Sequence, residues 1–118
     1  MANQVQYTVE WTLEPGGVER FKELAADVTG IVEANEPGMM GYHWYFNDDE
    51  SKCYLIEWFQ DAGKILDHLQ NVGTQLPELL EVSQITRFEV FGDLTDEARD
   101  AVTNFGADVL GHWQGFTR

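Results

Sequence analysis

Two side chains in the middle of the sequence have the chemistry needed for proton transfer. His68 stands in the run KILDHLQNV, one helical turn from Ile65 and from Val72, at the edge of an apolar stripe. An imidazole titrates near neutral pH, so a histidine that leans into a pocket suits general acid or base chemistry. The alternative is a histidine at the boundary of the core that hydrogen-bonds to a backbone carbonyl.

Glu57 is the second candidate because it interrupts the otherwise apolar run CYLIEWF. Burial would raise the pKa of this carboxyl, which could then act as a base or orient His68. An ion pair between Glu57 and Arg87 on a neighbouring strand is the alternative. We take His68 and Glu57 as the candidate catalytic residues.

Several ring side chains at strand spacing are candidates for stacking on a flat ligand. Packing in the core or in an interface is the competing explanation for each of them. The candidate substrate-binding residues are Tyr7, Trp11, His43, Tyr45 and Trp58.

Other kinds of catalytic or cofactor site lack their sequence patterns. The chain has no paired histidine motif, only one cysteine, and no glycine-rich phosphate loop after a strand, so no metal and no nucleotide cofactor is expected. Cys53 cannot form an internal disulfide and is interpreted as core filler in a reducing compartment. No apolar run approaches the ~20 residues of a membrane span, and MANQVQYTVEW lacks a signal pattern. These features favour a cytoplasmic protein.

The formal net charge of −14 also excludes classes of partner. Nucleic acid and anionic membrane surfaces both require a basic patch, whereas lysine occurs only at Lys22, Lys52 and Lys64. We therefore expect no nucleic acid and no membrane among the partners.

The elements that must position these residues follow from periodicity. Alternation over residues 5–13 predicts a strand, and apolar residues at helical spacing over 18–34 predict an amphipathic helix. Strands follow at 39–46 and 52–59, then a helix capped by Asp61, a helical turn with Pro77 near its start, and a strand from Ser83. This order is the ferredoxin-like βαββαβ arrangement with an antiparallel sheet, an α+β fold. We expect one domain over 1–118, with 95–118 as an extension that contains a helix capped by Thr95.

The hairpin at 39–59 is unusual because aromatic side chains alternate onto both of its faces. Two helices cover only one face of a four-stranded sheet, and monomers seldom expose large apolar patches. A second copy of the same sheet is the simplest cover for the other face, so we predict a homodimer joined sheet to sheet. We expect the apolar tail ADVLGHWQGFTR to help close this interface.

The run YLIEWFQDAGKILDHL resembles the third strand and second helix of antibiotic biosynthesis monooxygenase-like proteins, dimeric α/β barrels that include small quinol oxygenases. The features that match are Glu57 with Trp58 and Phe59 at a strand end, the turn at Asp61, and His68 on the helix. The resemblance covers roughly residues 3–93. Haem-degrading relatives differ, because this chain has Val9 and Glu10 where they place an asparagine, and no histidine in TQLPELLEV.

The resemblance implies oxygenation of a small aromatic or quinol substrate without metal or flavin. A deprotonated quinol can itself reduce O₂, so the protein need only bind the ring, take a proton and exclude water. Two other functions stay open on the same scaffold: a non-catalytic dimeric barrel that binds an apolar ligand or acts in stress response, and an isomerase or decarboxylase of a small ring compound.

Overall fold

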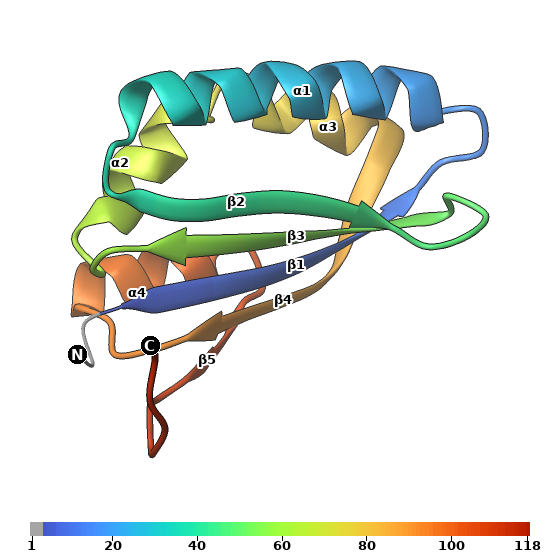
Figure 1. Cartoon of the computed structure of the whole chain (residues 1–118). Coiled ribbons are helices and arrows are strands. Elements are labelled where there is room, and N and C mark those ends of the chain that lie inside the picture. Colours follow the sequence, from blue (N-terminus) through green and yellow to red (C-terminus); the bar gives the residue numbers. More distant parts are fainter. Residues whose placement is uncertain (1–3) are drawn as a thin grey trace.

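The computed structural model describes residues 4–118, which form one sheet with helices on one side of it (Figure 1). The elements in chain order are β1 (Val5–Leu13), α1 (Val18–Asn35), β2 (Met39–Phe46), β3 (Lys52–Phe59), α2 (Lys64–Asn71), α3 (Leu76–Val82), β4 (Ser83–Phe91), α4 (Asp96–Thr103) and β5 (Asp108–Leu110). The predicted βαββαβ order is confirmed, with α3 as the short helical turn before the fourth strand.

The sheet is mixed and has the strand order β2-β3-β1-β4-β5. The first four strands pair antiparallel, but β5 pairs parallel to β4. The parallel pairing arises because α4 carries the chain back along the sheet before β5 begins. The expectation of a wholly antiparallel sheet is therefore wrong at this edge, where a three-residue strand was not predicted.

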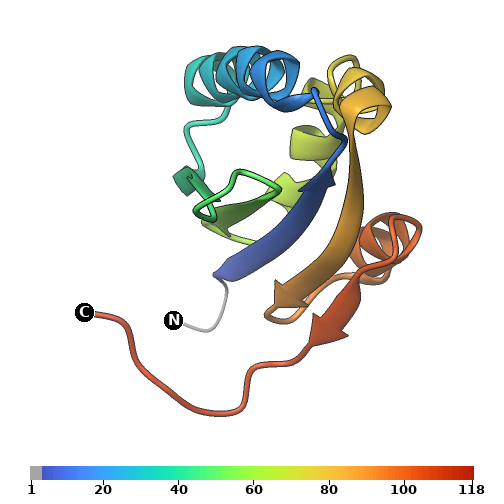
Figure 2. The same cartoon turned by 90° about the vertical axis from the view of Figure 1, so that its right-hand side faces the viewer.

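One face of the sheet, here called the inner face, carries the core. On β1 the alternate residues Val5, Tyr7, Val9, Trp11 and Leu13 are buried. The stripe predicted on the first helix packs above them, since Phe21, Leu24, Val28 and Val32 are buried on α1. Figure 2 shows α1, α2 and α3 over this face and α4 beside β4. The alternate residues of the strand and the apolar stripe of the helix thus pack against each other in one buried layer.

The start of α2 differs from the prediction. Gly63 is the N-terminal cap residue, and the Asp61 side chain makes no cap hydrogen bond to the helix. Instead, Asp61 Oδ1 accepts a hydrogen bond from the Gly63 N–H at 2.9 Å, within the turn that leads into the helix. Asp61 therefore holds the turn that sets the direction of α2.

The aromatic hairpin does have two faces. Tyr42, Trp44 and Phe46 point to the inner face, where the Trp44 Nε1–H donates to Thr29 Oγ1 on α1 at 2.9 Å. On the opposite, outer face, Tyr45 is 52 % exposed and Trp58 is 44 % exposed. Gly41 lies under the Trp58 ring, since a Cβ there would stand 2.9 Å from Trp58 Cε3. The outer face of the hairpin is therefore an exposed aromatic surface.

The C-terminal extension begins with the predicted helix. Thr95 Oγ1 accepts from the Ala98 N–H at 3.1 Å, so the predicted cap of α4 is confirmed. After β5, residues 111–118, here called the C-terminal arm, form no helix or strand and lead away from the sheet (Figure 2). A hollow of about 570 Å³ separates the arm from the outer face near Trp58 and Phe91.

Within residues 4–118, no helix combines the length and the apolar character needed to cross a membrane.

Candidate functional site

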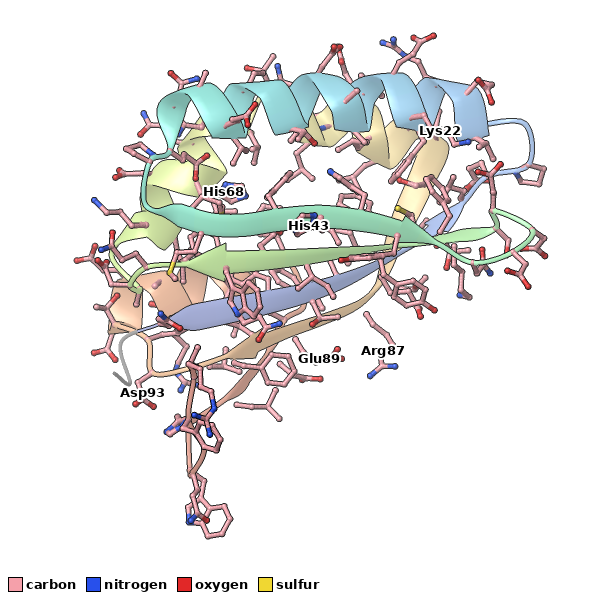
Figure 3. The ribbon with its side chains drawn as sticks, in the orientation of Figure 1. Lys22, His43, His68, Arg87, Glu89 and Asp93 are labelled. Carbon is pink, nitrogen blue, oxygen red and sulfur yellow. The ribbon has the colours of Figure 1, made fainter. Side chains whose placement is uncertain are left out.

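His68 lies between two glutamate carboxylates. Figure 3 shows His68 below α1. The ring atom Nδ1 is 3.0 Å from both carboxylate oxygens of Glu36. The other ring nitrogen, Nε2, is 2.9 Å from Glu57 Oε1. The alternative explanation for His68 is therefore wrong, because His68 contacts carboxylates rather than a backbone carbonyl. The alternative for Glu57 is wrong as well, because Arg87 pairs with Glu89 instead.

Each member of this cluster comes from a different part of the chain. Glu57 stands near the end of β3 on the inner face, opposite Tyr7 on β1 and Tyr42 on β2. His68 is on the buried side of α2, one turn after Ile65. Glu36 follows α1 and precedes Pro37, which disfavours helical geometry for the residue before it. Its backbone angles, φ −127° and ψ 75°, end the helix at that position.

The cluster is almost fully buried, and its charges act strongly on each other. Between 4 % and 7 % of the side-chain surface of Glu57, His68 and Glu36 is exposed. Burial by itself lowers the pKa of His68, but the charges of Glu57 and Glu36 and the hydrogen bonds to Glu36 outweigh it and raise that pKa to about 9. His68 is therefore an imidazolium at neutral pH, and a carboxylate beside it, rather than the ring, is the available base.

The two contacts of the imidazolium differ in geometry. Both oxygens of Glu36 accept from Nδ1, which fixes the ring orientation. Glu57 Oε1 lies at ion-pair distance from Nε2, yet it is buried without an aligned hydrogen-bond donor in the part of the chain that the structure describes. Catalytic hydrogen bonds are often poorly aligned before substrate binds. Oε1 of Glu57 is therefore free to accept a hydrogen bond, or a proton, from a bound substrate.

A cavity of about 60 Å³ adjoins this cluster. Glu57 and His68 line it together with Tyr7 and Trp11, and the other walls are mainly apolar. The Tyr7 hydroxyl and the Trp11 Nε1–H are buried with no hydrogen-bond partner among residues 4–118. Burial and the charges of Glu57 and Glu36 raise the pKa of Tyr7 far above its usual range, so its hydroxyl stays protonated. The cavity therefore presents two unpaired donors and one acceptor.

The candidate substrate-binding residues divide between the two faces of the sheet. Tyr7 and Trp11 line the cavity beside Glu57 and His68. His43, Tyr45 and Trp58 lie on the outer face instead, where the ring centroids of His43 and Tyr45 are 6.3 Å apart. Figure 3 marks His43 on β2. Trp58 lines the hollow beneath the C-terminal arm. The structure thus brings together the catalytic candidates with two of the five binding candidates.

Glu36 is the member of the cluster that sequence reasoning missed. The segment EPG reads as the stop of a helix, and that reading is correct for the backbone. The available signal was that a glutamate before a proline leaves the helix with its side chain free to turn inward. Tyr42 is also on the cavity wall, but in the sequence it is one of several aromatic residues on the same strand, so no pattern singles it out.

The described residues contain no group of three or more His, Cys, Asp or Glu side chains arranged to hold a metal ion. The two carboxylates touch opposite nitrogens of the His68 ring, so they do not converge on one point with it. Cys53 is buried, and burial raises the pKa of its thiol to about 11, which fits its interpretation as a core residue.

Solved structures with the same fold come from several organisms. MupZ from Pseudomonas fluorescens superposes with a TM-score of 0.88 at 24 % identity, over 98 % of this chain and 95 % of that chain. SnoaB, a cofactor-independent oxygenase from Streptomyces nogalater, gives 0.67 at 18 % identity over 80 % and 96 %. A conserved protein from Methanosarcina mazei gives 0.68 at 15 % identity over 78 % and 94 %. The likeness to MupZ therefore includes the C-terminal extension.

No curated protein sequence matches the chain. The family model described as antibiotic biosynthesis monooxygenase matches residues 7–75, the segment that contains Glu36, Glu57 and His68. The chain therefore belongs to the antibiotic biosynthesis monooxygenase family.

Proposed function

We propose that this protein is a cofactor-independent monooxygenase that oxidises a small aromatic or quinol substrate in the cavity beside Glu57 and His68. The observation that carries the proposal is the buried Glu57–His68 pair at 2.9 Å, next to a cavity with unpaired donors. Family membership and the likeness to SnoaB, a cofactor-independent oxygenase, support it.

In this mechanism Glu57 takes the proton of a ring hydroxyl. The nearby imidazolium of His68 and the Tyr7 hydroxyl stabilise the negative charge that develops on the substrate. The electron-rich anion then reduces O₂ directly. One oxygen atom enters the ring, the other leaves as water, and the substrate supplies all the electrons, so no separate reductant is needed. Burial of the site keeps bulk water from the reactive anion.

The cavity must enlarge when substrate binds. A volume of about 60 Å³ holds about two water molecules, whereas a dry cavity of about 150 Å³ accommodates benzene. Phe105 lines the cavity and is 40 % exposed, in the segment that follows α4. We take Phe105 as the wall residue that moves, because the other aromatic walls are held within the sheet.

The test is oxygen uptake by the purified protein, freed of metal and flavin, with a panel of reduced quinones and dihydroxy-aromatics. Consumption of O₂ that depends on the protein, with incorporation of ¹⁸O from ¹⁸O₂ into the product, is the expected result. Binding of flat aromatics without turnover would favour the ligand-binding barrel instead.

An isomerase is the second candidate, because a protonated imidazole and a carboxylate stand 2.9 Å apart at the cavity wall. Such a pair can remove a proton at one position and return one at another. An isomerase would exchange substrate protons with deuterated water under nitrogen, whereas the monooxygenase needs O₂ for turnover.

The assembly that we propose for this enzyme is a homodimer joined through the outer faces of the two sheets. Its basis is the exposed aromatic surface of Tyr45 and Trp58, which a second copy would cover. The single-domain organisation and the cytoplasmic location stay predictions.

A further inference from the structure

The C-terminal arm, residues 111–118, holds its largest side chains in solvent. Trp113 is 89 % exposed and Phe116 is 81 % exposed, more than any other large apolar side chain of residues 4–118. Burying an aromatic side chain of this size is a major source of binding energy at interfaces. The arm therefore carries two anchors that its own chain does not use.

The arm also fails to cover the sheet that it passes. A hollow of about 570 Å³ lies between the arm and the outer face, with Trp58 and Phe91 on the sheet side and Phe116 on the arm side. Figure 2 shows the arm leading away from β5 on the side opposite the helices. An apolar surface and an apolar arm of one chain thus face each other across a space that neither fills.

The charge of the arm differs from that of the rest of the chain. The segment GHWQGFTR has no Asp or Glu and ends in Arg118, whereas the whole sequence has 21 acidic and 7 basic side chains. Two acidic surfaces repel each other. An arm without acidic side chains does not meet this repulsion when it approaches an acidic body. Every Asp and Glu of the sequence lies within residues 1–110, so the body of a second copy carries all of its negative side chains.

We propose that the C-terminal arms of two copies are exchanged, so that each arm clasps the outer face of the partner and buries Trp113 and Phe116 there. The inference rests on the proposed homodimer and assigns its interface. A dimer with two-fold symmetry buries both arms at once, because each copy provides the same arm and the same outer face to receive it. Part of the partner occupies the hollow, which accounts for the gap within one chain.

The experiment measures the dimer dissociation constant of the full chain by analytical ultracentrifugation. The double variant Trp113→Ala/Phe116→Ala is expected to bind its partner ~30-fold more weakly or worse, the effect of losing one strong anchor. Both side chains are exposed within one chain, so the variant leaves the fold intact. Leu80→Ala is the matched control, since Leu80 is 43 % exposed but lies on α3 on the helix side.

Isotope-filtered NMR on a mixture of labelled and unlabelled protein checks the exchange directly. Contacts between the Trp113 indole of one copy and the Trp58 indole of the other are expected. A dimer whose dissociation constant is unchanged by the double variant overturns the arm exchange and leaves the face-to-face dimer standing. A wild-type chain that stays monomeric at high micromolar concentration overturns both, and oxygen uptake tests the proposed reaction separately.

Discussion

Tyr7 and Glu57 are register partners across β1 and β3, and both line the same small cavity. The hydroxyl of one is a buried donor without a partner, and an oxygen of the other is a buried acceptor without an aligned donor, within the described residues. Native proteins rarely leave such groups unpaired side by side unless water or a ligand joins them. In the mechanism proposed above, a hydroxylated ring would be held by this pair.

Removing the Tyr7 hydroxyl should therefore separate stability from function. In Tyr7→Phe the buried donor without a partner disappears, so the free energy of unfolding should be unchanged or rise by up to about 1 kcal/mol. Binding of a hydroxylated aromatic should weaken at the same time, as measured by calorimetry. A clear loss of stability would show that the hydroxyl is satisfied in solution and does not await a ligand.

Glu57 should carry the proton transfer. Glu57→Gln keeps the shape of the side chain but removes the base, so the rate of oxygen uptake should fall by ~10²-fold or more. Glu33→Gln, an exposed change on α1, is the control. His68→Ala should lower the rate to a similar degree, because it removes the charge that stabilises the anion. Activity within a few-fold of wild type in both site variants would exclude the cluster from catalysis.

His68 should give the protein a characteristic dependence of stability on pH. Its pKa is raised from 6.5 to about 9 in the folded state, so the stabilisation it provides is fully present below about pH 6.5. It is lost as the pH rises through about 9, and the total is roughly 3 kcal/mol. Chemical denaturation between pH 6 and 10 should show this fall, and His68→Gln should flatten it. A wild-type curve parallel to that of His68→Gln would contradict the raised pKa.

A charged substitution on the outer face of the sheet should prevent dimer formation. Trp58→Glu would bury an unpaired carboxylate in the proposed interface, so the mass measured by light scattering should shift from dimer to monomer. Trp44→Glu is not a suitable test, since Trp44 packs against Phe21 in the core and its change should unfold the chain. A Trp58→Glu protein that remains dimeric would place the interface elsewhere.

Added salt should stabilise the protein. With a formal net charge of −14, repulsion outweighs attraction over the surface, and the Arg20–Glu23 and Lys22–Glu50 pairs are exposed and therefore weak. Screening should raise the melting temperature between low salt and moderate sodium chloride. A steady fall over that range would mean that attractive pairs dominate.

The parts of the site on regular elements were the parts that sequence could predict. Glu57 was visible as a break in an apolar strand, and His68 as a polar residue on a helical stripe, because periodicity assigns each a face. Glu36 was not visible because it stands where a helix has ended, and no period describes where such a side chain points.

Alternation also could not decide which face of the hairpin would be covered. Both faces of the hairpin formed by β2 and β3 carry aromatic side chains, so the pattern allows His43, Tyr45 and Trp58 to line a pocket. Only the position of the helices puts these three residues outside. The strand Asp108–Leu110 is three residues long, too short for alternation to show, and its parallel pairing depends on where α4 packs.

The short parallel strand β5 has a consequence for how the sheet can grow. Within residues 4–118 it pairs only with Glu89–Phe91, at one end of β4, and α4 packs beside it. An exposed edge strand can pair with strands of other molecules, and repeated pairing of this kind produces fibrils. Because β5 is short and α4 packs beside it, further strands cannot easily be added to this edge of the sheet. The proposed dimer, which forms through the sheet faces, therefore does not lead to fibrils that grow from this edge.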